Sequence, residues 1–357
     1  MQTALYEIHK DLGAKLVEFH GWEMPIHYQG IIHEHQVVRQ QVGLFDVSHM
    51  GRIFIEGEDA LALLDFLSTN DLSDKQDGTA TYTVWCAENG TCVDDLIVYQ
   101  ENPKKFFVIV NAGNREKDLL HLQHYAKDFQ VVITDRFRED GILALQGPHA
   151  EKVLSQLFPE VVQLKHMQFL NVFDEGLTIT IARTGYTGSD GFEIYAAHSA
   201  IVKLWKALLE KGKAYGIEPI GLGARNTLRL EMGYALYGHE LSDTIAVTES
   251  VSAWTVKWHK SNFLGKAALQ SLKQSQHCRH EYGITLIGKG IAREGYPVFQ
   301  NGKEIGYVTS GTQSPTLNQA IAIILVEAKL QKGDLVEVQI RQDLCPAKVV
   351  ALPFVRL

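Results

Sequence analysis

Cysteine and long apolar runs are both scarce in this chain of 357 residues. Its four cysteines, Cys86, Cys92, Cys278 and Cys345, include no Cys-x-x-Cys pair, which argues against a zinc knuckle or a dithiol redox site. We expect free, buried thiols in a reducing compartment. No stretch approaches the roughly 18 apolar residues that a membrane-spanning helix needs. We therefore expect no membrane association.

Positive charge is dispersed along the chain. There are 34 Lys and Arg residues against 42 Asp and Glu residues, which gives a net charge of −8, and no basic block occurs. Nucleic acid is therefore not an expected partner, although a local basic pocket can still bind a small anion. The chain also lacks the Gly-x-Ser-x-Gly and P-loop patterns. Its first residues do not resemble a secretory signal.

Fifteen histidines invite the hypothesis of a metal centre. The pairs His33-x-His35 and His277-x-x-His280 have no further Cys or carboxylate at a spacing typical of zinc ligands. We therefore predict no metal site and expect these histidines to be solvated.

The sequence does contain alternating helix and strand patterns. Helices are predicted over residues 59–68, after a capping Asn114, from 148 to 158 and over 200–211; strands are predicted at 96–99, 106–110, 142–145, 178–182 and 192–196. The turn at Asn102-Pro103-Lys104 predicts an antiparallel hairpin between the first two strands. From about residue 282, short strands and Gly, Asn and Pro turns dominate, with 336–340 and 348–352 the clearest strands. This pattern predicts an α+β fold with a C-terminal β barrel.

Two adjacent carboxylates, Asp94 and Asp95, begin the apolar strand predicted at 96–99. Because side chains alternate along a strand, we expect one of them to face inward and the other outward. A carboxylate at an apolar wall can serve a cationic reaction centre. The alternative, which the spacing alone favours, is that both cap the turn that follows Asn89-Gly90.

A second cluster, Arg183–Glu193, contains three glycines that allow a ligand to approach the backbone closely. Glu193 alternates with Phe192 and Ile194 and so points away from them. Such a carboxylate can accept two hydrogen bonds from a flat ligand rich in N–H groups, such as a pterin. A tight hairpin with a solvated Glu193 is an equally weighted alternative.

A third cluster, Gly221–Glu231, reads as a loop that enters a helix. Arg225 and Arg229 are four residues apart and so share a helical face. Together they are suited to a ligand with a carboxylate group. Pairing of one arginine with Glu231 or another nearby acid is the ordinary alternative. The glycines do not form a dinucleotide fingerprint, since the third glycine is missing.

In their joint order, these clusters resemble the T-protein family of aminomethyltransferases over essentially the whole chain. The stretches that carry the resemblance are Gly21-Trp22-Glu23-Met24-Pro25, Gly43–Gly51, Glu88–Tyr99, Val110-Asn111-Ala112, Leu145-Gln146-Gly147-Pro148, Arg183–Glu193, Gly221–Glu231, Tyr237-Gly238, Phe263-Leu264-Gly265-Lys266, Thr309–Leu317 and Leu352-Pro353-Phe354. The chain departs from the family pattern at Asn226, where Asp is usual, and across residues 245–254.

The resemblance implies a three-domain cloverleaf around a central folate cavity. Residues 1–50 with 140–270 are expected to form a discontinuous folate-binding domain. Residues 51–139 are expected to form a second α+β domain that carries the Asp-Asp strand, and residues 271–357 the C-terminal barrel.

The resemblance also implies roles for particular residues. Asp95 corresponds to the catalytic carboxylate beside the reacting nitrogens of folate. Glu193 corresponds to the residue that holds the pterin, and Arg225 to a folate-contacting arginine. The remaining positions expected near the cofactor are Tyr82, Asn111, Tyr186 and Tyr234.

The implied reaction belongs to the glycine cleavage system. It transfers the methylene group of an aminomethyl-dihydrolipoyl arm, carried by a lipoylated H-protein, to tetrahydrofolate and releases ammonia, without a metal. The expected location is the cytoplasm of a bacterium, or the mitochondrial matrix of a eukaryote after processing. The alternative is a folate-binding relative that has another one-carbon substrate or no transferase activity.

Overall fold

The computed structural model describes residues 1–174, 176–275 and 278–357. The chain divides into two compact units of discontinuous sequence, and each is described by itself. The first unit contains Met1–Leu64, Leu72–Tyr82 and Leu96–Asn226; the second contains Asp65–Asp71, Thr83–Asp95 and Thr227–Leu357. Four elements contribute residues to both units: α3 (Ala60–Leu67), β5 (Thr79–Cys86), β6 (Cys92–Asn102) and α7 (Leu222–Glu231).

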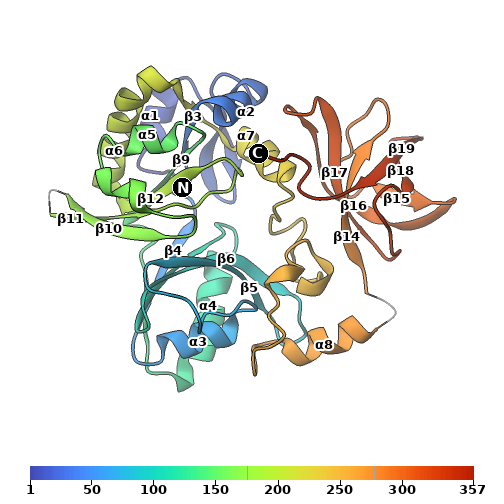
Figure 1. Cartoon of the computed structure of the whole chain (residues 1–357), viewed down its shortest axis with the longest axis horizontal. Coiled ribbons are helices and arrows are strands. Elements are labelled where there is room, and N and C mark those ends of the chain that lie inside the picture. Colours follow the sequence, from blue (N-terminus) through green and yellow to red (C-terminus); the bar gives the residue numbers. More distant parts are fainter. Residues whose placement is uncertain (175, 276–277) are drawn as a thin grey trace. The chain divides into compact units, whose positions relative to one another are not determined.

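A six-stranded sheet of the order β10-β11-β12-β9-β3-β13 organises the first unit (Figure 1). Its strands are β3 (Val42–Asp46), β9 (Asp140–Gln146), β10 (Phe169–Asp174), β11 (Leu177–Ala182), β12 (Gly191–Ala197) and β13 (Ile217–Ile220). All neighbours are antiparallel except β13 and β3. The predicted strands at 142–145, 178–182 and 192–196 are confirmed as the middle of this sheet.

Alternation along β12 gives the sheet two different faces. Phe192 and Ile194 are buried in an apolar core with Ile201 and Trp205, which belong to α6 (His198–Gly212). The helices α1 (Tyr6–Asp11) and α5 (Ala150–Leu154) contribute to the same core. Glu193 therefore points to the opposite face of β12, together with the residues two positions before and after it.

A second sheet has the order β5-β6-β7-β4-β8. In addition to β5 and β6, its strands are β4 (Gly51–Glu56), β7 (Lys105–Val110) and β8 (Val132–Asp135). The predicted hairpin is confirmed, since β6 and β7 are antiparallel with Val98 opposite Val108. The helix α4 (Arg115–Tyr125) lies on one side of this sheet (Figure 1). The remaining elements of the first unit are β1 (Lys15–Phe19), β2 (Trp22–His27) and α2 (Ile31–Gln40).

A buried ion pair within the first unit joins residues of the two sheets. Arg52 Nη1 donates to Asp140 Oδ2 at 3.0 Å, and Arg52 Nη2 donates to Thr180 at 3.2 Å. The guanidinium also lies 4.6 Å from the ring centroid of Phe107. Burial lowers the pKa of Arg52, while Asp140 favours its charged form. Removal of the carboxylate would therefore leave a buried cation with little compensation.

Asp46 ties the N-terminus to the end of β3. Its two oxygens accept hydrogen bonds from Thr3 Oγ1 at 2.6 Å and from the Ser48 backbone N–H at 2.9 Å, and His9 Nε2 lies 2.9 Å away. Burial would by itself raise the pKa of Asp46, but His9, Ser48 and Thr3 lower it overall. Three residues later, His49 is buried, and burial together with Arg225 lowers its pKa to about 3.

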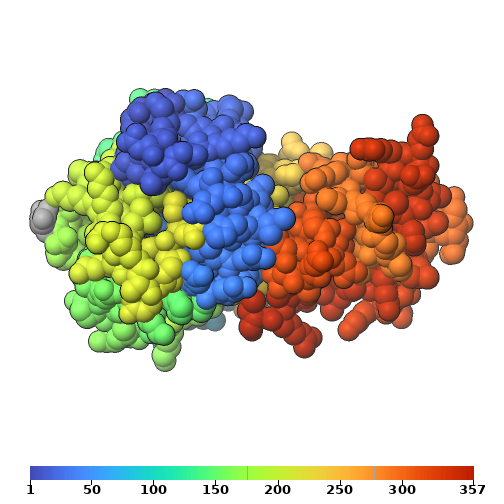
Figure 2. Space-filling view, turned by 90° about the horizontal axis from the view of Figure 1, so that it is seen from above, coloured from blue at the N-terminus to red at the C-terminus, as the bar shows by residue number. Residues whose placement is uncertain are grey.

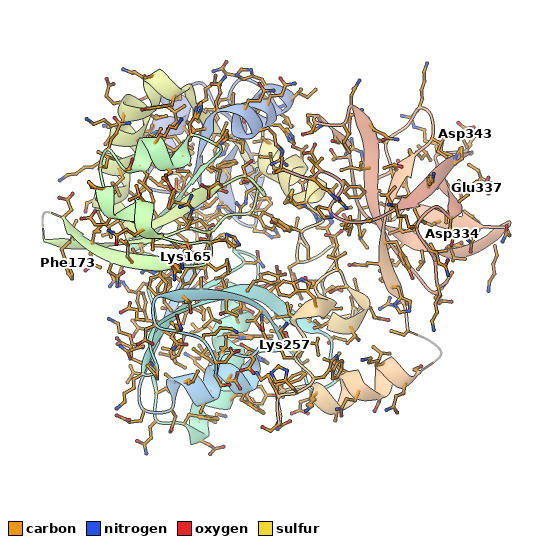
Figure 3. The ribbon with its side chains drawn as sticks, viewed as in Figure 1. Lys165, Phe173, Lys257, Asp334, Glu337 and Asp343 are labelled. Atoms are coloured by element: carbon orange, nitrogen blue, oxygen red, sulfur yellow. The ribbon has the colours of Figure 1, made fainter. Side chains whose placement is uncertain are left out.

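The second unit contains a closed barrel of the order β14-β17-β16-β15-β18-β19, coloured orange to red in Figure 2. Its strands are β14 (His280–Leu286), β15 (Pro297–Gln300), β16 (Lys303–Ser314), β17 (Gln319–Val326), β18 (Leu335–Ile340) and β19 (Asp343–Val350). Val336 and Val338 fill the barrel interior, whereas Glu337 between them projects outward (Figure 3). The predicted C-terminal barrel is confirmed. This unit also contains α8 (Lys266–Gln274).

Several local predictions are wrong in detail. The predicted helix at 148–158 shrinks to the five residues of α5, because the chain turns at Leu154–Phe158 toward a short 3₁₀ helix. Asn114 precedes α4 but its side chain makes no capping hydrogen bond. The last barrel strand ends at Val350, before Leu352.

The expectation of solvated histidines also fails in part. His33 is exposed, but His35 is buried, since it lies on the inner face of α2 together with Val38. His277 lies outside the described residues. No helix among the described residues is long and apolar enough to cross a membrane.

Asp140→Asn should destabilise the protein strongly, because it leaves Arg52 buried without its counter-ion. Breaking a buried ion pair from one side typically costs about 3–5 kcal/mol. The matched control is Glu58→Gln, which breaks an exposed pair with Lys104. Urea denaturation should give a much lower midpoint for the first variant and a nearly unchanged one for the second. Equal midpoints for both variants would show that the buried pair contributes no more to stability than the exposed pair.

Acid should destabilise the fold partly through His49. The folded protein keeps this imidazole neutral down to about pH 3, whereas an unfolded chain protonates it near pH 6.5. Stability should therefore fall as the pH decreases below about 6.5, by up to roughly 1.4 kcal/mol per pH unit. The His49→Gln variant should lose less stability than wild type between about pH 7 and about pH 4. Parallel pH profiles of the unfolding free energy would contradict this assignment.

Candidate functional site

Glu193 occupies the centre of the sheet face that is opposite the apolar core of the first unit. Its direct neighbours across the sheet are Ala144 on β9 and Ala182 on β11. Paired residues in an antiparallel sheet point to the same side, so two methyl groups flank the carboxylate. Neither neighbour has a side-chain group that can donate a hydrogen bond to Glu193.

One oxygen of Glu193 is surrounded by hydroxyl groups. Oε2 accepts hydrogen bonds from Thr184 Oγ1 at 2.6 Å and from Tyr195 OH at 3.1 Å, and Tyr99 OH lies 3.5 Å away. The two tyrosine hydroxyls are 2.6 Å apart. Glu193 is only 7% exposed, so the alternative of a solvated carboxylate is wrong.

Both tyrosines remain donors at neutral pH. Burial raises the pKa of Tyr195 well above its usual value, and the nearby Glu193 raises it further. The pKa of Tyr99 is raised for the same two reasons. Neither phenol ionises near neutrality, so each keeps its proton for a hydrogen bond.

Arg225 stacks on Tyr186 beside this carboxylate. Its guanidinium carbon lies 4.6 Å from the ring centroid of Tyr186, and Nη2 is 3.9 Å from Met50 Sδ. Burial lowers the pKa of Arg225, while Glu193 favours its charged form. Within the part of the chain that the structure describes, Arg225 makes no salt bridge, so its guanidinium can pair with an anionic ligand group.

The glycine-containing loop that carries Tyr186 is fixed at both ends. Arg183 Nε and Nη2 donate to the two oxygens of Asp190 at 2.9 and 2.5 Å. Gln146 Nε2 donates to the carbonyl of Thr184 at 3.1 Å, and its Oε1 accepts from Thr187 at 2.8 Å. These contacts hold the loop against the end of β9 and fix the backbone that carries Tyr186.

The predicted pair of arginines does not act as one anion receptor. Arg229 Nη1 donates to Glu240 Oε2 at 2.9 Å and Nη2 donates to Ser310 Oγ at 2.8 Å, so its charge is already neutralised. The alternative of pairing with a nearby acid is thus correct for Arg229, with Glu240 in place of Glu231. Glu231 instead accepts hydrogen bonds from Ser314 and Thr316.

The Asp-Asp pair lies on β6, as predicted, but neither carboxylate faces solvent. Asp94 is fully buried and Asp95 is 9% exposed. Leu96, on the same face as Asp94, and Tyr99, on the same face as Asp95, are buried as well, so both faces of this part of the strand are covered. The prediction that one of the pair points outward is therefore wrong.

Three other predicted site residues have varied surroundings. Tyr82 lies on β5 and is half-buried, and Asn111 directly follows β7 and is also half-buried. Tyr234 belongs to the second unit, is 37% exposed, and accepts a hydrogen bond from Arg229 at its backbone carbonyl.

The sequence analysis missed the hydroxyl groups around Glu193. Tyr195 was detectable, because it is two residues from Glu193 on the same strand and must share its face. Thr184 lies inside the Arg183–Glu193 cluster, but no sequence pattern assigned it a role. Tyr99 carried no such signal, since it is 94 positions from Glu193 and its proximity depends on tertiary structure.

The described residues contain no group of three or more His, Cys, Asp or Glu side chains that could hold a metal ion. Cys86 and Cys92 are buried and Cys278 and Cys345 are half-buried, and none of the four forms a disulfide bond. Burial raises the pKa of Cys86 to about 12, so this thiol is not a nucleophile at neutral pH.

Known proteins match the chain over nearly its full length. The GCVT N-terminal domain model matches residues 5–260, and the glycine cleavage T-protein C-terminal barrel domain model matches residues 279–356. An aminomethyltransferase of Desulfitobacterium hafniense is 44% identical over 98% of this chain and 96% of its own length. The aminomethyltransferase of Bacillus subtilis is 42% identical, over 99% and 98% respectively.

A solved structure agrees with these sequences. The glycine cleavage system aminomethyltransferase T of Bartonella henselae superposes with a TM-score of 0.93 at 33% identity, and the match covers 99% of this chain and 98% of that one. The mixed α/β architecture, the C-terminal barrel and the sequence similarity all agree. The chain therefore belongs to the glycine cleavage T-protein family of aminomethyltransferases.

Proposed function

We propose that this protein is the aminomethyltransferase of a glycine cleavage system, with tetrahydrofolate as the acceptor and a lipoylated H-protein as the donor. Family membership supports the reaction type. The observation that carries the acceptor assignment is the arrangement around Glu193, with one oxygen held by hydroxyls and nearby Arg225, which makes no salt bridge among the described residues. A carboxylate and a guanidinium together suit a ligand that combines N–H donors with acidic groups.

The transfer balances without an oxidant or a metal. The carbon–sulfur bond of the aminomethyl-dihydrolipoyl arm and the carbon–nitrogen bond to its amino group both break. Two carbon–nitrogen bonds form to the acceptor nitrogens of tetrahydrofolate. The two N–H protons of the acceptor leave with the products, one on the dihydrolipoyl thiol and one on ammonia.

Asp95 is proposed as the catalytic carboxylate. The methylene carbon becomes electron-poor as each of its bonds breaks, and a fixed negative charge in a water-poor environment stabilises developing positive charge. Asp95 fits this role by its low exposure and its apolar strand. The same group can accept a proton from an acceptor nitrogen.

Glu193 is proposed to bind the pterin and Arg225 to contact an acidic part of the folate. Tyr82, Asn111, Tyr186 and Tyr234 are proposed as further cofactor contacts. We also propose the three-domain division at residues 1–50 with 140–270, 51–139 and 271–357. A folate-binding relative without transferase activity is the second candidate, and an assay with aminomethylated H-protein separates the two.

Tetrahydrofolate should bind the wild-type protein and raise its melting temperature, since a ligand specific for the folded state stabilises it by mass action. Glu193→Ala should weaken this binding, because a hydrogen bond to a charged group is worth roughly 1.5–3 kcal/mol. Isothermal titration calorimetry measures both affinities. Glu58→Gln, an exposed carboxylate change, serves as the control. Equal affinities of wild type and Glu193→Ala would remove Glu193 from the site.

Asp95→Asn should slow single-turnover transfer from aminomethylated H-protein by about 10²–10³-fold, because it removes charge but keeps shape. Tetrahydrofolate affinity should change much less. Asp94→Asn is the matched control. Asp94 is fully buried, so its replacement should lower the melting temperature, whereas the transfer rate should fall much less than in Asp95→Asn. If both variants lost rate in proportion to lost stability, the catalytic role of Asp95 would be rejected.

A further inference from the structure

The number of protons on the hydroxyl groups around Glu193 limits which hydrogen bonds these groups can donate. Each hydroxyl can donate only one hydrogen bond. Thr184 and Tyr195 both direct theirs to Glu193 Oε2. Tyr99 then has one proton left to place, and its shortest contact is the Tyr195 oxygen at 2.6 Å. Tyr99 and Tyr195 thus form a chain of hydrogen bonds that ends on Oε2, and Thr184 donates to the same oxygen directly.

The other carboxylate oxygen has no such partner. Every hydrogen bond that Glu193 accepts from the described residues is made by Oε2, and none by Oε1. Cross-strand neighbours cannot supply a donor, because they are Ala144 and Ala182. Oε1 is therefore an open acceptor on a carboxylate whose second oxygen is fixed.

We propose that Thr184, Tyr195 and Tyr99 are positioning residues that fix Glu193 by Oε2 and thereby reserve Oε1 for N–H donors of the acceptor substrate. This inference rests on the proposed function, since it takes tetrahydrofolate as that substrate. The three hydroxyl-bearing side chains are buried, so their role does not require contact with the ligand. They act on its affinity through the orientation of Glu193.

Preorganisation is the physical reason for the effect. A free glutamate loses side-chain rotamer freedom when it binds a ligand, and part of the binding energy is consumed in this ordering. Hydrogen bonds that already fix the carboxylate reduce that cost before the ligand arrives. Because Tyr99 donates to Tyr195, it also strengthens the Tyr195 bond to Glu193 through cooperative polarisation.

A purely structural role makes a different prediction. If the hydroxyls only satisfied a buried charge, their removal would lower stability but leave the affinity of the folded protein unchanged. Ligand affinity and its coupling to Glu193 therefore distinguish the two roles, whereas melting temperature alone does not.

The test compares Tyr195→Phe and Thr184→Val, each of which removes one hydroxyl donor and keeps most of the side-chain volume. Calorimetric titration with tetrahydrofolate should give a dissociation constant about tenfold higher for each variant. In the transfer assay, KM for tetrahydrofolate should rise with a much smaller change in kcat. Thr184→Ser, which restores the hydroxyl, should recover most of the affinity.

The matched controls are Tyr215→Phe and Thr178→Val. Both residues belong to the first unit, Thr178 is exposed, and neither contacts Glu193. Their dissociation constants should equal that of wild type within about twofold.

A double-mutant cycle decides whether the effect passes through Glu193. In a Glu193→Gln background, Tyr195→Phe should change the dissociation constant by less than about twofold. A full tenfold effect in that background would overturn the inference, as would unchanged affinity of both single variants. If wild type itself does not bind tetrahydrofolate, the proposed function fails first and this inference with it.

Discussion

The constraint on which the rest of this structure depends is the need to hydrogen bond carboxylates that folding removes from water. A buried charge without partners is too costly to persist. Glu34 meets this need by accepting backbone N–H groups of Tyr28, Gln29 and Gly30 on one oxygen, and of Gly221 on the other. A single side chain on α2 thereby fixes a turn and the entry of α7.

The same rule recurs within the second unit. Glu240 accepts from Arg229 and the Leu236 backbone on one oxygen and from Thr309 on the other. Glu231 accepts from Ser314 and from Thr316. These acids connect α7 and the loop after it to barrel strand β16. The stretches Gly221–Glu231 and Thr309–Leu317 are thus linked by hydrogen bonds between residues far apart in the sequence.

This dependence shows why the sequence predicted some features and not others. The strands β11 and β12 and the helix α6 were predictable, because their apolar spacing repeats locally and each packs on one core. The hydrogen bond between Arg229 and Ser310 was not predictable, since the two residues lie 81 positions apart. Arg225 and Arg229 share a helical face, and only tertiary contacts distinguish Arg229, which pairs with Glu240, from Arg225, which makes no salt bridge among the described residues. Asp94 was misjudged for the same reason, because alternation cannot report that both faces of a strand are covered.

Several other buried carboxylates differ from Glu193, because both of their oxygens accept hydrogen bonds. Glu34, Asp46 and Glu240 have partners on both oxygens. Glu281 also leaves one oxygen without a described partner, but burial and the nearby Glu240 raise its pKa well above the usual value and so disfavour its charged form. Glu193 instead lies near the charged Arg225. An ordered carboxylate with one open oxygen near a cation therefore supports the proposal that the substrate supplies the missing hydrogen-bond donors.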